Sequence, residues 1–418
     1  MRILIVGSGG REHALAWKLS QEAEVFACPG NPGIADVCEM FDCKVGDTVG
    51  IAALADRLSI DLILYGPEDP LIAGAADVLR RKGLLVFGPG QDGARLEGSK
   101  AFAKQQMILA GIPTAEFQSF DDPEAALNYA RDRFQSGRQV AVKASGAALG
   151  KGVLLCAELS EAEEAIQSML IDRELGLAGE TIVIEDRLMG KEFSLMAIVG
   201  GPNFWCLPPV QDYKRIHDGD QGPNTGGMGS FSPVPWVSEP LLRRTEAEVI
   251  APMVQHLSTQ CIDFRGMLFA GILVQNNEPY CLEYNVRWGD PETQSIVRRL
   301  GSGLAESLRC ASEGRPIAPP EVLQNAAVSV VVASAGYPGA VKKGFALHLE
   351  PLQQDVLVFQ AGTSSSGSEL VTNGGRVLAI SSEAQTLEQA RYLAYEGLQR
   401  VRFEGMQYRR DIAESPNH

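Results

Sequence analysis

The 418-residue sequence contains eight cysteines but no Cys-x-x-Cys pair, so neither a zinc site nor a disulfide framework is expected. It lacks an apolar run long enough to span a membrane, and no signal-peptide pattern precedes its first predicted strand. These absences fit a protein of the reducing cytoplasm. The formal net charge of −15 argues against nucleic acid or an anionic membrane as a partner.

The composition is that of a globular protein, with 45% hydrophobic and 21% charged residues. A chain of 418 residues is too long for one hydrophobic core, so we expect about three domains. Near the N-terminus, predicted strands at 2–6, 24–27, 61–65 and 84–87 alternate with predicted helices at 11–20, 49–59 and 71–82. This order predicts an α/β domain with a parallel sheet and ligands at the carboxyl ends of its strands.

A glycine-rich turn, Gly7–Gly10, follows the first predicted strand. It does not fit the dinucleotide pattern, because Glu12 stands at the third glycine position and the second strand ends in Cys28–Gly30 without a ribose-binding acid. A loop that holds a single phosphate at a helix N-terminus fits better. The alternative is that these glycines only allow tight packing between strand and helix.

A second polar turn, Tyr65–Leu71, follows a later strand and should lie at the same edge of the sheet. Glu68 and Asp69 could bind sugar hydroxyls there. They could equally be N-cap residues of the next helix.

The segment from residue 98 to residue 192 carries lysines in positions typical of nucleotide binding. A predicted helix from Gly98 to Gly111 places Lys100 and Lys104 on one face, and a strand at 139–143 ends in Lys143. The small-residue segment 144–153 contains Lys151 but continues as a strand, so it is not a P-loop. It is either a lid over nucleotide phosphates or a flexible β-turn.

A predicted hairpin, 267–274 followed by 281–286, places alternate side chains on one face. Glu283, Asn285 and Arg287 share that face, and Leu282, Tyr284 and Val286 should belong to the core. Carboxylate and amide oxygens suit Mg²⁺, and a neighbouring arginine can neutralise a phosphoryl group in transfer. The alternative is a solvent-facing polar surface of an ordinary antiparallel hairpin.

The order of these segments resembles that of the ATP-grasp ligases, and within them the phosphoribosylamine–glycine ligase (glycinamide ribonucleotide synthetase) family. The resemblance extends over essentially the whole chain. Its most specific motifs are Val6–Leu15 (VGSGGREHAL), Gln211–Arg215 (QDYKR), Gly222–Gly229 (GPNTGGMG) and Asn285–Gln294 (NVRWGDPETQ).

Some positions depart from the usual pattern of this family or of its relatives. Ser145 replaces an Asp, Tyr213 stands where His is frequent, and the hinge contains Asp186 and Arg187. Gly271, by contrast, agrees with the resemblance, because many other grasp ligases carry an acidic metal ligand at this position. The departures put nucleotide packing in question more than the reaction.

The resemblance implies an ATP-grasp fold of the α/β class with a Rossmann-like pre-grasp domain, an inserted lid subdomain and a small C-terminal domain. The implied boundaries are 1–102 for the N-terminal domain, 103–120 and 193–327 for the grasp core, 121–192 for the lid, and 328–418 for the C-terminal domain. In the last of these, no chemistry is expected beyond the turn Ser334–Gly339 at the edge of the site.

The resemblance also assigns roles to residues. Glu283 and Asn285 would hold Mg²⁺ or Mn²⁺, Arg287 would meet the transferring phosphoryl group, and Lys151 would close from the lid. ATP would contact Lys100, Lys143, Gly150, Lys151, Gly152, Glu185, Leu188 and Glu192. The substrates would contact Gly9, Gly10, Arg11, Glu12, Glu68, Asp212, Lys214, Gly226, Gly227, Met228, Arg287, Asp290 and Pro291.

The implied reaction joins glycine to 5-phosphoribosylamine through glycyl phosphate, with ATP converted to ADP and phosphate, in purine biosynthesis. The protein is expected to act as a cytoplasmic monomer. Two alternatives are a different grasp ligase or carboxylase with another acceptor, and a non-catalytic nucleotide-binding module. Intact Lys143, Glu283 and Arg287 argue against the latter.

Overall fold

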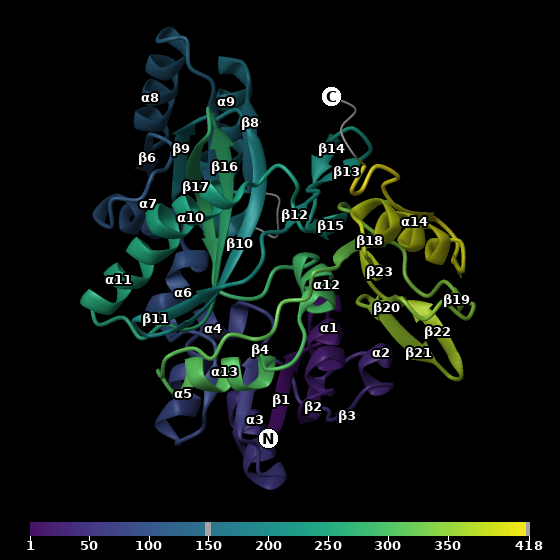
Figure 1. The fold of residues 1–418 in the computed structure, drawn as a ribbon. Coiled ribbons are helices and arrows are strands. Elements are labelled where there is room, and N and C mark those ends of the chain that lie inside the picture. The colour runs from purple at the N-terminus through teal and green to yellow at the C-terminus, as the bar shows by residue number, and fades with distance from the viewer. Residues whose placement is uncertain (147–151, 415–418) are drawn as a thin grey trace.

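A computed structural model describes residues 1–146 and 152–414 of the chain. Gly150 and Lys151, which the family resemblance predicts to bind nucleotide, lie outside the described residues. Figure 1 shows the N-terminal part at the bottom, two antiparallel sheets above it and the C-terminal part at the right. Within the described residues, none of the helices is both long and apolar enough to cross a bilayer.

The N-terminal part is a parallel sheet with strand order β3-β2-β1-β4-β5. Ile3 to Val6 of its central strand are fully buried, as expected of a strand covered on both faces. Its strands are β1 (Arg2–Gly7), β2 (Glu24–Pro29), β3 (Glu39–Met40), β4 (Leu62–Tyr65) and β5 (Val86–Phe87). Its helices are α1 (Gly10–Leu19), α2 (Pro32–Ala35), α3 (Thr48–Leu58), α4 (Asp69–Ile72), α5 (Ala75–Arg81) and α6 (Gln91–Gly98).

The two antiparallel sheets have orders β11-β10-β16-β17 and β6-β9-β7-β8. The first contains β10 (Lys191–Gly200), β11 (Asn203–Cys206), β16 (Arg265–Gln275) and β17 (Glu278–Asn285), with α7 (Lys100–Leu109), α10 (Glu239–Thr245), α11 (Ala251–Thr259) and α13 (Leu304–Ser312). The second contains β6 (Phe117–Phe120), β7 (Val140–Ala144), β8 (Val153–Cys156) and β9 (Ile182–Asp186), with α8 (Pro123–Gln135) and α9 (Leu159–Ile166). Asp122 caps α8 and is followed by a proline, the usual way to begin a helix.

The C-terminal sheet has strand order β12-β15-β18-β23-β20, and β25 also pairs with β18. Its elements are β12 (Gln211–Asp212), β15 (Gly229–Ser232), β18 (Ala326–Ser334), β20 (Val356–Gln360), β23 (Arg376–Ala384), β25 (Met406–Gln407) and α14 (Leu387–Leu398). Smaller two-stranded pairs are β13 (Arg215–His217) with β14 (Gln221–Asn224), β19 (His348–Leu349) with β24 (Val401–Arg402), and β21 (Thr363–Ser366) with β22 (Glu369–Thr372). The segment 211–229 thus contains short strands, and β12 and β15 belong to this sheet.

The hairpin β16–β17 confirms the predicted run, turn and run. Asn276 and Asn277 form its turn with positive φ values of 53° and 64°. A bulge next to Ile272 keeps Glu283 opposite Gly271. A Cβ on Gly271 would lie 3.3 Å from Cγ of Glu283, so this glycine leaves room for the carboxylate chain. Tyr284 and Val286 are buried as expected, whereas Leu282 is only half-buried.

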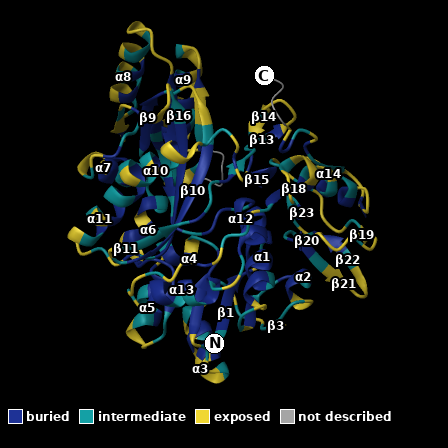
Figure 2. Cartoon of the chain, in the orientation of Figure 1, coloured by how far each residue is buried: buried dark blue, intermediate teal, exposed yellow. Residues whose placement is uncertain are grey.

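The parts of the molecule share continuous apolar cores. One core joins Leu4 of the N-terminal sheet to Phe193 and Tyr284 of the antiparallel sheet β11-β10-β16-β17. Another joins Ile3 to Trp288 and to Phe359 of the C-terminal sheet. Figure 2 shows α1, β1 and α12 (Glu292–Ile296) in dark blue where these parts meet. The predicted α/β class and grasp architecture are therefore confirmed.

Buried serines hold α12 against the C-terminal sheet. Ser295 Oγ lies 3.0 Å from the carbonyl oxygen of Ser230 and 2.9 Å from Oγ of Ser329. Ser381 Oγ donates to the carbonyl oxygen of Gln294 at 2.8 Å. All four serines are fully buried, so these hydrogen bonds replace water that cannot reach the groups.

We expect Ser295→Ala to destabilise the protein by about 1–3 kcal/mol, because its buried polar partners lose a hydrogen-bonding group. The measurement is the midpoint of thermal unfolding by circular dichroism. Ser365→Ala, on the exposed strand β21, is the control and should leave the midpoint unchanged. Equal midpoints for the two variants would contradict a role of the serine contacts in stability.

Candidate active site

Glu283 lies on β17 among lysines from three other elements. Burial acts to raise the pKa of its carboxyl group, but Lys214, Lys100 and Lys143 outweigh burial and hold that pKa below its usual value. Glu283 is therefore ionised at neutral pH. Because several cations face this one carboxylate, the site suits a further anion and not only a metal cation.

Arg287 is held by two carboxylates from the N-terminal part. Its guanidinium group lies 2.9 Å from Oε1 of Glu97 and 3.4 Å from Oε2 of Glu68, and it donates to Oδ1 of Asn285 at 3.3 Å. Glu97, on α6, also accepts from the backbone N–H of Val286 at 2.7 Å. Sequence reasoning missed Glu97, and burial raises its pKa to about 7.

Glu68 occupies the N-cap position of α4 but makes no capping bond with its side chain. Burial acts to raise the pKa of its carboxyl group, but Arg287 and then Arg11 lower that pKa below its usual value. Glu68 thus occupies the predicted N-cap position, but its side chain pairs with Arg287 and does not cap the helix.

Lys143, at the end of β7, forms an ion pair with Glu185 of β9. Lys104 of α7 forms a second ion pair with the same carboxylate at 2.5 Å and donates to Oγ1 of Thr114 at 2.6 Å. All three charged side chains are buried. Lys100 and Lys104 both belong to α7, as their four-residue spacing predicted, but no role was predicted for Lys104.

Lys214 lies between the acidic side chains of β10 and β12. Its Nζ donates to Oε2 of Glu192 at 2.8 Å. Burial acts to lower the pKa of Lys214, but Glu192 and Asp212 outweigh burial and raise it well above its usual value. Glu192, predicted to contact ATP, therefore has a protein partner in this structure.

Two carboxyl groups, the half-buried Asp212 and the buried Glu292, are close enough to Lys214 for its charge to oppose the rise in pKa that burial causes in each. Burial, followed by the charge of Asp212, raises the pKa of Glu292 to about 7. Oε1 of Glu292 accepts from Oγ of Ser194 at 3.3 Å. Sequence reasoning missed Glu292, although it belongs to the GDPETQ segment that had been singled out.

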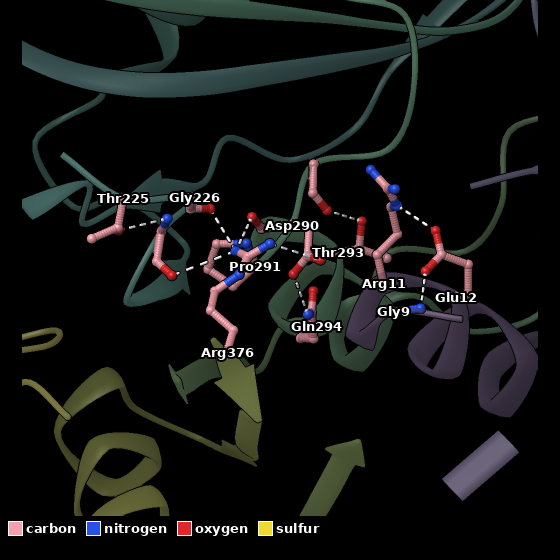
Figure 3. Close-up of polar contacts among 12 residues, drawn as sticks. Gly9, Arg11, Glu12, Thr225, Gly226, Asp290, Pro291, Thr293, Gln294 and Arg376 are labelled. Carbon is pink, nitrogen blue, oxygen red and sulfur yellow. Dashed lines mark hydrogen bonds and ion pairs between the residues drawn. The ribbon is translucent and has the colours of Figure 1, made fainter. Parts of the chain in front are cut away.

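The glycine-rich segment is residues 225–228, and Figure 3 shows its Thr225 and Gly226 near Asp290 and Arg376. The guanidinium group of Arg376 lies 3.1 Å from Oδ2 of Asp290. Burial acts to raise the pKa of Asp290, but Arg376 and then Arg11 hold it below its usual value. Oδ1 of Asp290 accepts from Nε2 of Gln294 at 2.7 Å.

The backbone N–H groups of this segment have acceptors within the protein. Gly226 donates to the hydroxyl of Tyr337 at 2.9 Å, Gly227 to Oγ1 of Thr225 at 2.9 Å, and Met228 to the carbonyl of Tyr213 at 2.8 Å. Two of these acceptors, Tyr337 and Tyr213, lie outside the segment, so its motif alone could not reveal them.

The N-terminus of α1 is closed by its own acidic residue. Glu12 accepts from the N–H of Gly9 at 2.5 Å and from Nε of Arg11 at 2.7 Å. A Cβ on Gly66 would lie 1.8 Å from Oε1 of Glu12, and a Cβ on Gly7, whose φ is +144°, would also be too close to the Glu12 side chain. Gly7 therefore fits the alternative in which the glycines allow tight packing. Arg11 also donates to the carbonyl of Trp288 at 3.1 Å.

The remaining predicted nucleotide contacts are placed as follows. Lys100 is the first residue of α7, and its N-cap Ser99 accepts from the N–H of Phe102. Leu188 is half-buried in the connection after β9, and Gly152 directly precedes β8. Among the residues that the structure describes, no group of three or more His, Cys, Asp and Glu side chains is arranged to hold a metal ion.

One antiparallel sheet carrying Glu283 and Asn285, with a second carrying Lys143 and Glu185, is the architecture of an ATP-grasp enzyme. Family models of phosphoribosylglycinamide synthetase match residues 1–97 (N domain), 98–293 (ATP-grasp (A) domain) and 327–415 (C domain). The chain belongs to the phosphoribosylglycinamide synthetase family.

Full-length relatives agree. The chain is 41% identical to phosphoribosylamine–glycine ligase of Halalkalibacterium halodurans, covering 99% of this chain and 96% of the relative. It is 42% identical to that of Vibrio cholerae, covering 99% and 97%. The crystal structure of phosphoribosylamine–glycine ligase from Thermotoga maritima is similar, with a TM-score of 0.86, 37% identity and coverage of 99% and 100%.

A more distant structure shares the fold alone. Biotin carboxylase from Campylobacter jejuni has a TM-score of 0.73 at 15% identity, covering 100% of this chain and 95% of that chain. At this identity the similarity carries no information on the acceptor substrate.

We expect Glu292→Gln to be more stable than wild type above pH 7. The folded-state pKa of about 7 exceeds the ordinary value of 4.5, so stability is full below about pH 4.5 and is lost as the pH rises through 7. Glutamine does not ionise and avoids that loss, which is on the order of 1–3 kcal/mol. The difference in unfolding temperature between Glu292→Gln and wild type, measured at pH 5 and at pH 8, tests this expectation.

The exposed Glu369→Gln provides the control and should match wild type at both pH values. The same difference between Glu292→Gln and wild type at pH 5 and at pH 8 would contradict the ionisation of Glu292 in this range.

Proposed function

We propose that the chain is an ATP-dependent ligase that joins glycine to 5-phosphoribosylamine, giving glycinamide ribonucleotide, ADP and phosphate in purine biosynthesis. The observation that carries this proposal is the identity of about two residues in five to phosphoribosylamine–glycine ligases over 99% of the chain. The charges of the site support the same chemistry, because lysines and an arginine gather around one carboxylate in a chain of net charge −15.

The donor set fits a divalent metal bound together with a polyphosphate. Glu283 supplies an ionised carboxylate and Asn285 an amide oxygen, and hard oxygen ligands of this kind suit Mg²⁺ or Mn²⁺. Gly271 supplies no second acid opposite Glu283. A metal held by Glu283 and Asn285 would supply positive charge that stabilises the negative charge of the phosphates.

Nucleotide binding is proposed for the lysines and the hinge. Lys100 and Lys143 would hold phosphate oxygens, with Gly150, Lys151 and Gly152 contributing from the segment before β8. The backbone from Glu185 to Leu188 would contact adenine, and Glu192 the ribose. In support, the carboxylate of Glu185 forms ion pairs with both Lys143 and Lys104, so each lysine has a partner for its charge.

The acceptor substrates are proposed to lie between α1, β12 and α12. Gly9, Gly10, Arg11, Glu12 and Glu68 would face the phosphoribosyl group, with Arg11 as the nearest cation. Glycine would lie near the other predicted residues, which are Asp212, Lys214, Gly226, Gly227, Met228, Arg287, Asp290 and Pro291. Because the N–H groups of Gly226, Gly227 and Met228 bond within the protein, side-chain cations would bind the carboxylate.

The proposed chemistry has two steps. The carboxylate of glycine attacks the γ-phosphorus of ATP, with Arg287 next to the transferring phosphoryl group, and ADP leaves. The amine of 5-phosphoribosylamine then attacks the carbonyl carbon of glycyl phosphate, and phosphate leaves with one oxygen of the glycine carboxylate. The protein mainly positions the reactants and excludes water from the acyl phosphate.

The remaining sequence-based assignments are also proposals. These are the boundaries 1–102, 121–192 and 328–418, a monomeric state and a cytoplasmic location. The grouping of strands supports a separate lid sheet, whereas β12 and β15 join the C-terminal sheet although they precede residue 328.

Glycine labelled with ¹⁸O in its carboxylate tests the proposed chemistry. Label should appear in inorganic phosphate during turnover with 5-phosphoribosylamine, because one carboxylate oxygen leaves with the phosphoryl group. Mass spectrometry of the released phosphate measures the transfer. Label retained in glycine and product, or AMP and pyrophosphate as products, would contradict the mechanism.

Glu283→Gln should lower turnover at least ~10²-fold with the fold intact, because it removes the charge that would hold the metal next to the phosphates. ADP release under saturating Mg²⁺ measures this loss. Glu278→Gln, on the same strand but exposed and paired with Arg244, is the matched control and should retain wild-type turnover. Wild-type turnover of Glu283→Gln would rule out the metal role.

A further inference from the structure

Arg376, the first residue of β23, extends from the C-terminal sheet into the site (Figure 3). One guanidinium nitrogen donates to the carbonyl oxygen of Gly226 at 2.5 Å and to that of Asp290 at 2.7 Å, and it lies 3.5 Å from the carbonyl oxygen of Gly227. The other terminal nitrogen lies 3.1 Å from Oδ2 of Asp290. Arg376 thus joins two segments that are far apart in the sequence.

These contacts continue to the N-terminus of α1. Asp290 accepts from Nε2 of Gln294, and a Cβ on Gly10 would lie only 2.8 Å from the same nitrogen. A run of direct contacts therefore connects Arg376, Asp290, Gln294 and Gly10. It includes both regions in which the acceptor substrates are proposed to bind.

The glycine-rich segment has little freedom of its own once these contacts are made. A Cβ on Gly226 would lie 3.1 Å from Cζ of Arg376. Gly227 adopts φ +109°, and a Cβ there would lie 2.3 Å from Cδ of Pro291. The N–H of Gly226 donates to Tyr337, which is also C-terminal. Arg376, Tyr337 and Pro291 together determine where this segment lies.

We propose that Arg376 is a positioning residue for the acceptor half of the reaction. It holds the Gly226–Gly227 segment against the Asp290–Pro291 turn in the arrangement that receives glycine and 5-phosphoribosylamine. The inference rests on the proposed function. It assigns a part in the chemistry to the C-terminal sheet, from which the sequence predicted none.

A planar guanidinium group is required for this role. Two terminal nitrogens reach a carboxylate and at least two carbonyl oxygens at once, which a single ammonium group on a flexible chain does not reproduce. Within residues 1–146 and 152–414, the polar partners of Arg376 are Gly226, Gly227 and Asp290, and neither Glu283 nor Lys143 is among them. The effect of changing Arg376 should therefore be confined to the acceptor substrates.

Arg376→Lys tests the proposal by steady-state kinetics with each substrate varied in turn. We expect kcat/KM for glycine or 5-phosphoribosylamine to fall about 10- to 100-fold, the loss typical of small misplacements of reacting groups. The Kd for Mg²⁺ with a non-hydrolysable ATP analogue should remain at the wild-type value. In Arg376→Ala, added guanidinium ions should restore part of kcat/KM, whereas ammonium ions should not.

Arg298→Lys is the matched control. Arg298 is a buried arginine that, like the half-buried Arg376, forms an ion pair with an acidic side chain, here Glu383 of β23 at 3.0 Å, but its polar contacts in the described part of the chain do not include the glycine-rich segment. It should keep wild-type kinetic constants even if its unfolding temperature falls. Equal losses of acceptor and nucleotide binding in Arg376→Lys would overturn the proposal, as would wild-type kinetics.

If Arg376→Lys does not fold, Tyr337→Phe takes its place, because it removes only the acceptor of the Gly226 N–H. The same loss confined to the acceptor substrates is expected, and wild-type constants would overturn the proposal. ADP release by the wild-type protein tests the proposed function separately from the role of Arg376. If this release does not depend on both acceptor substrates, the proposed function is wrong. If it does, the kinetics of the variants test the role of Arg376 alone.

Discussion

Pairing of buried charge is the constraint on which the site depends. Cations removed from water need a carboxylate partner, and leaving one unpaired costs several kcal/mol. Glu185 pairs with the buried Lys104 and Lys143, and Glu97 with Glu68 pairs with the largely buried Arg287. The more exposed Lys214 pairs with Glu192 in the same way. Each pair also fixes the direction of a cation, so the cations of the site are held in place within a chain that is acidic overall.

The same pairing unites elements that are distant in sequence. Arg287 follows β17, yet its carboxylates come from α4 and α6 in the N-terminal part. Asp290 comes just after it and is paired from β23 in the C-terminal part. The short stretch from Glu283 to Gln294 is thus fixed from two sides, and α12 is anchored by serine hydroxyls as well. Its many special residues reflect this crowding.

Local patterns were sufficient for much of the fold. Alternating polarity predicted the hairpin and its Glu283 face, and the strand–helix order predicted the parallel sheet, because both signals repeat within a few residues. Glu97, Glu292 and Arg376 could not be found in this way, since their importance depends on partners that only the folded chain brings near.

The membership of β15 in the C-terminal sheet has a consequence for synthesis. Its partner β18 and the strand β23 that carries Arg376 are made much later than β15 itself. During translation, domains generally fold in the order in which they emerge from the ribosome. Here the glycine-rich segment has no sheet to join until the last part of the chain is available. A nascent chain can complete its N-terminal sheet early, but it gains an ordered acceptor site only when synthesis is almost finished.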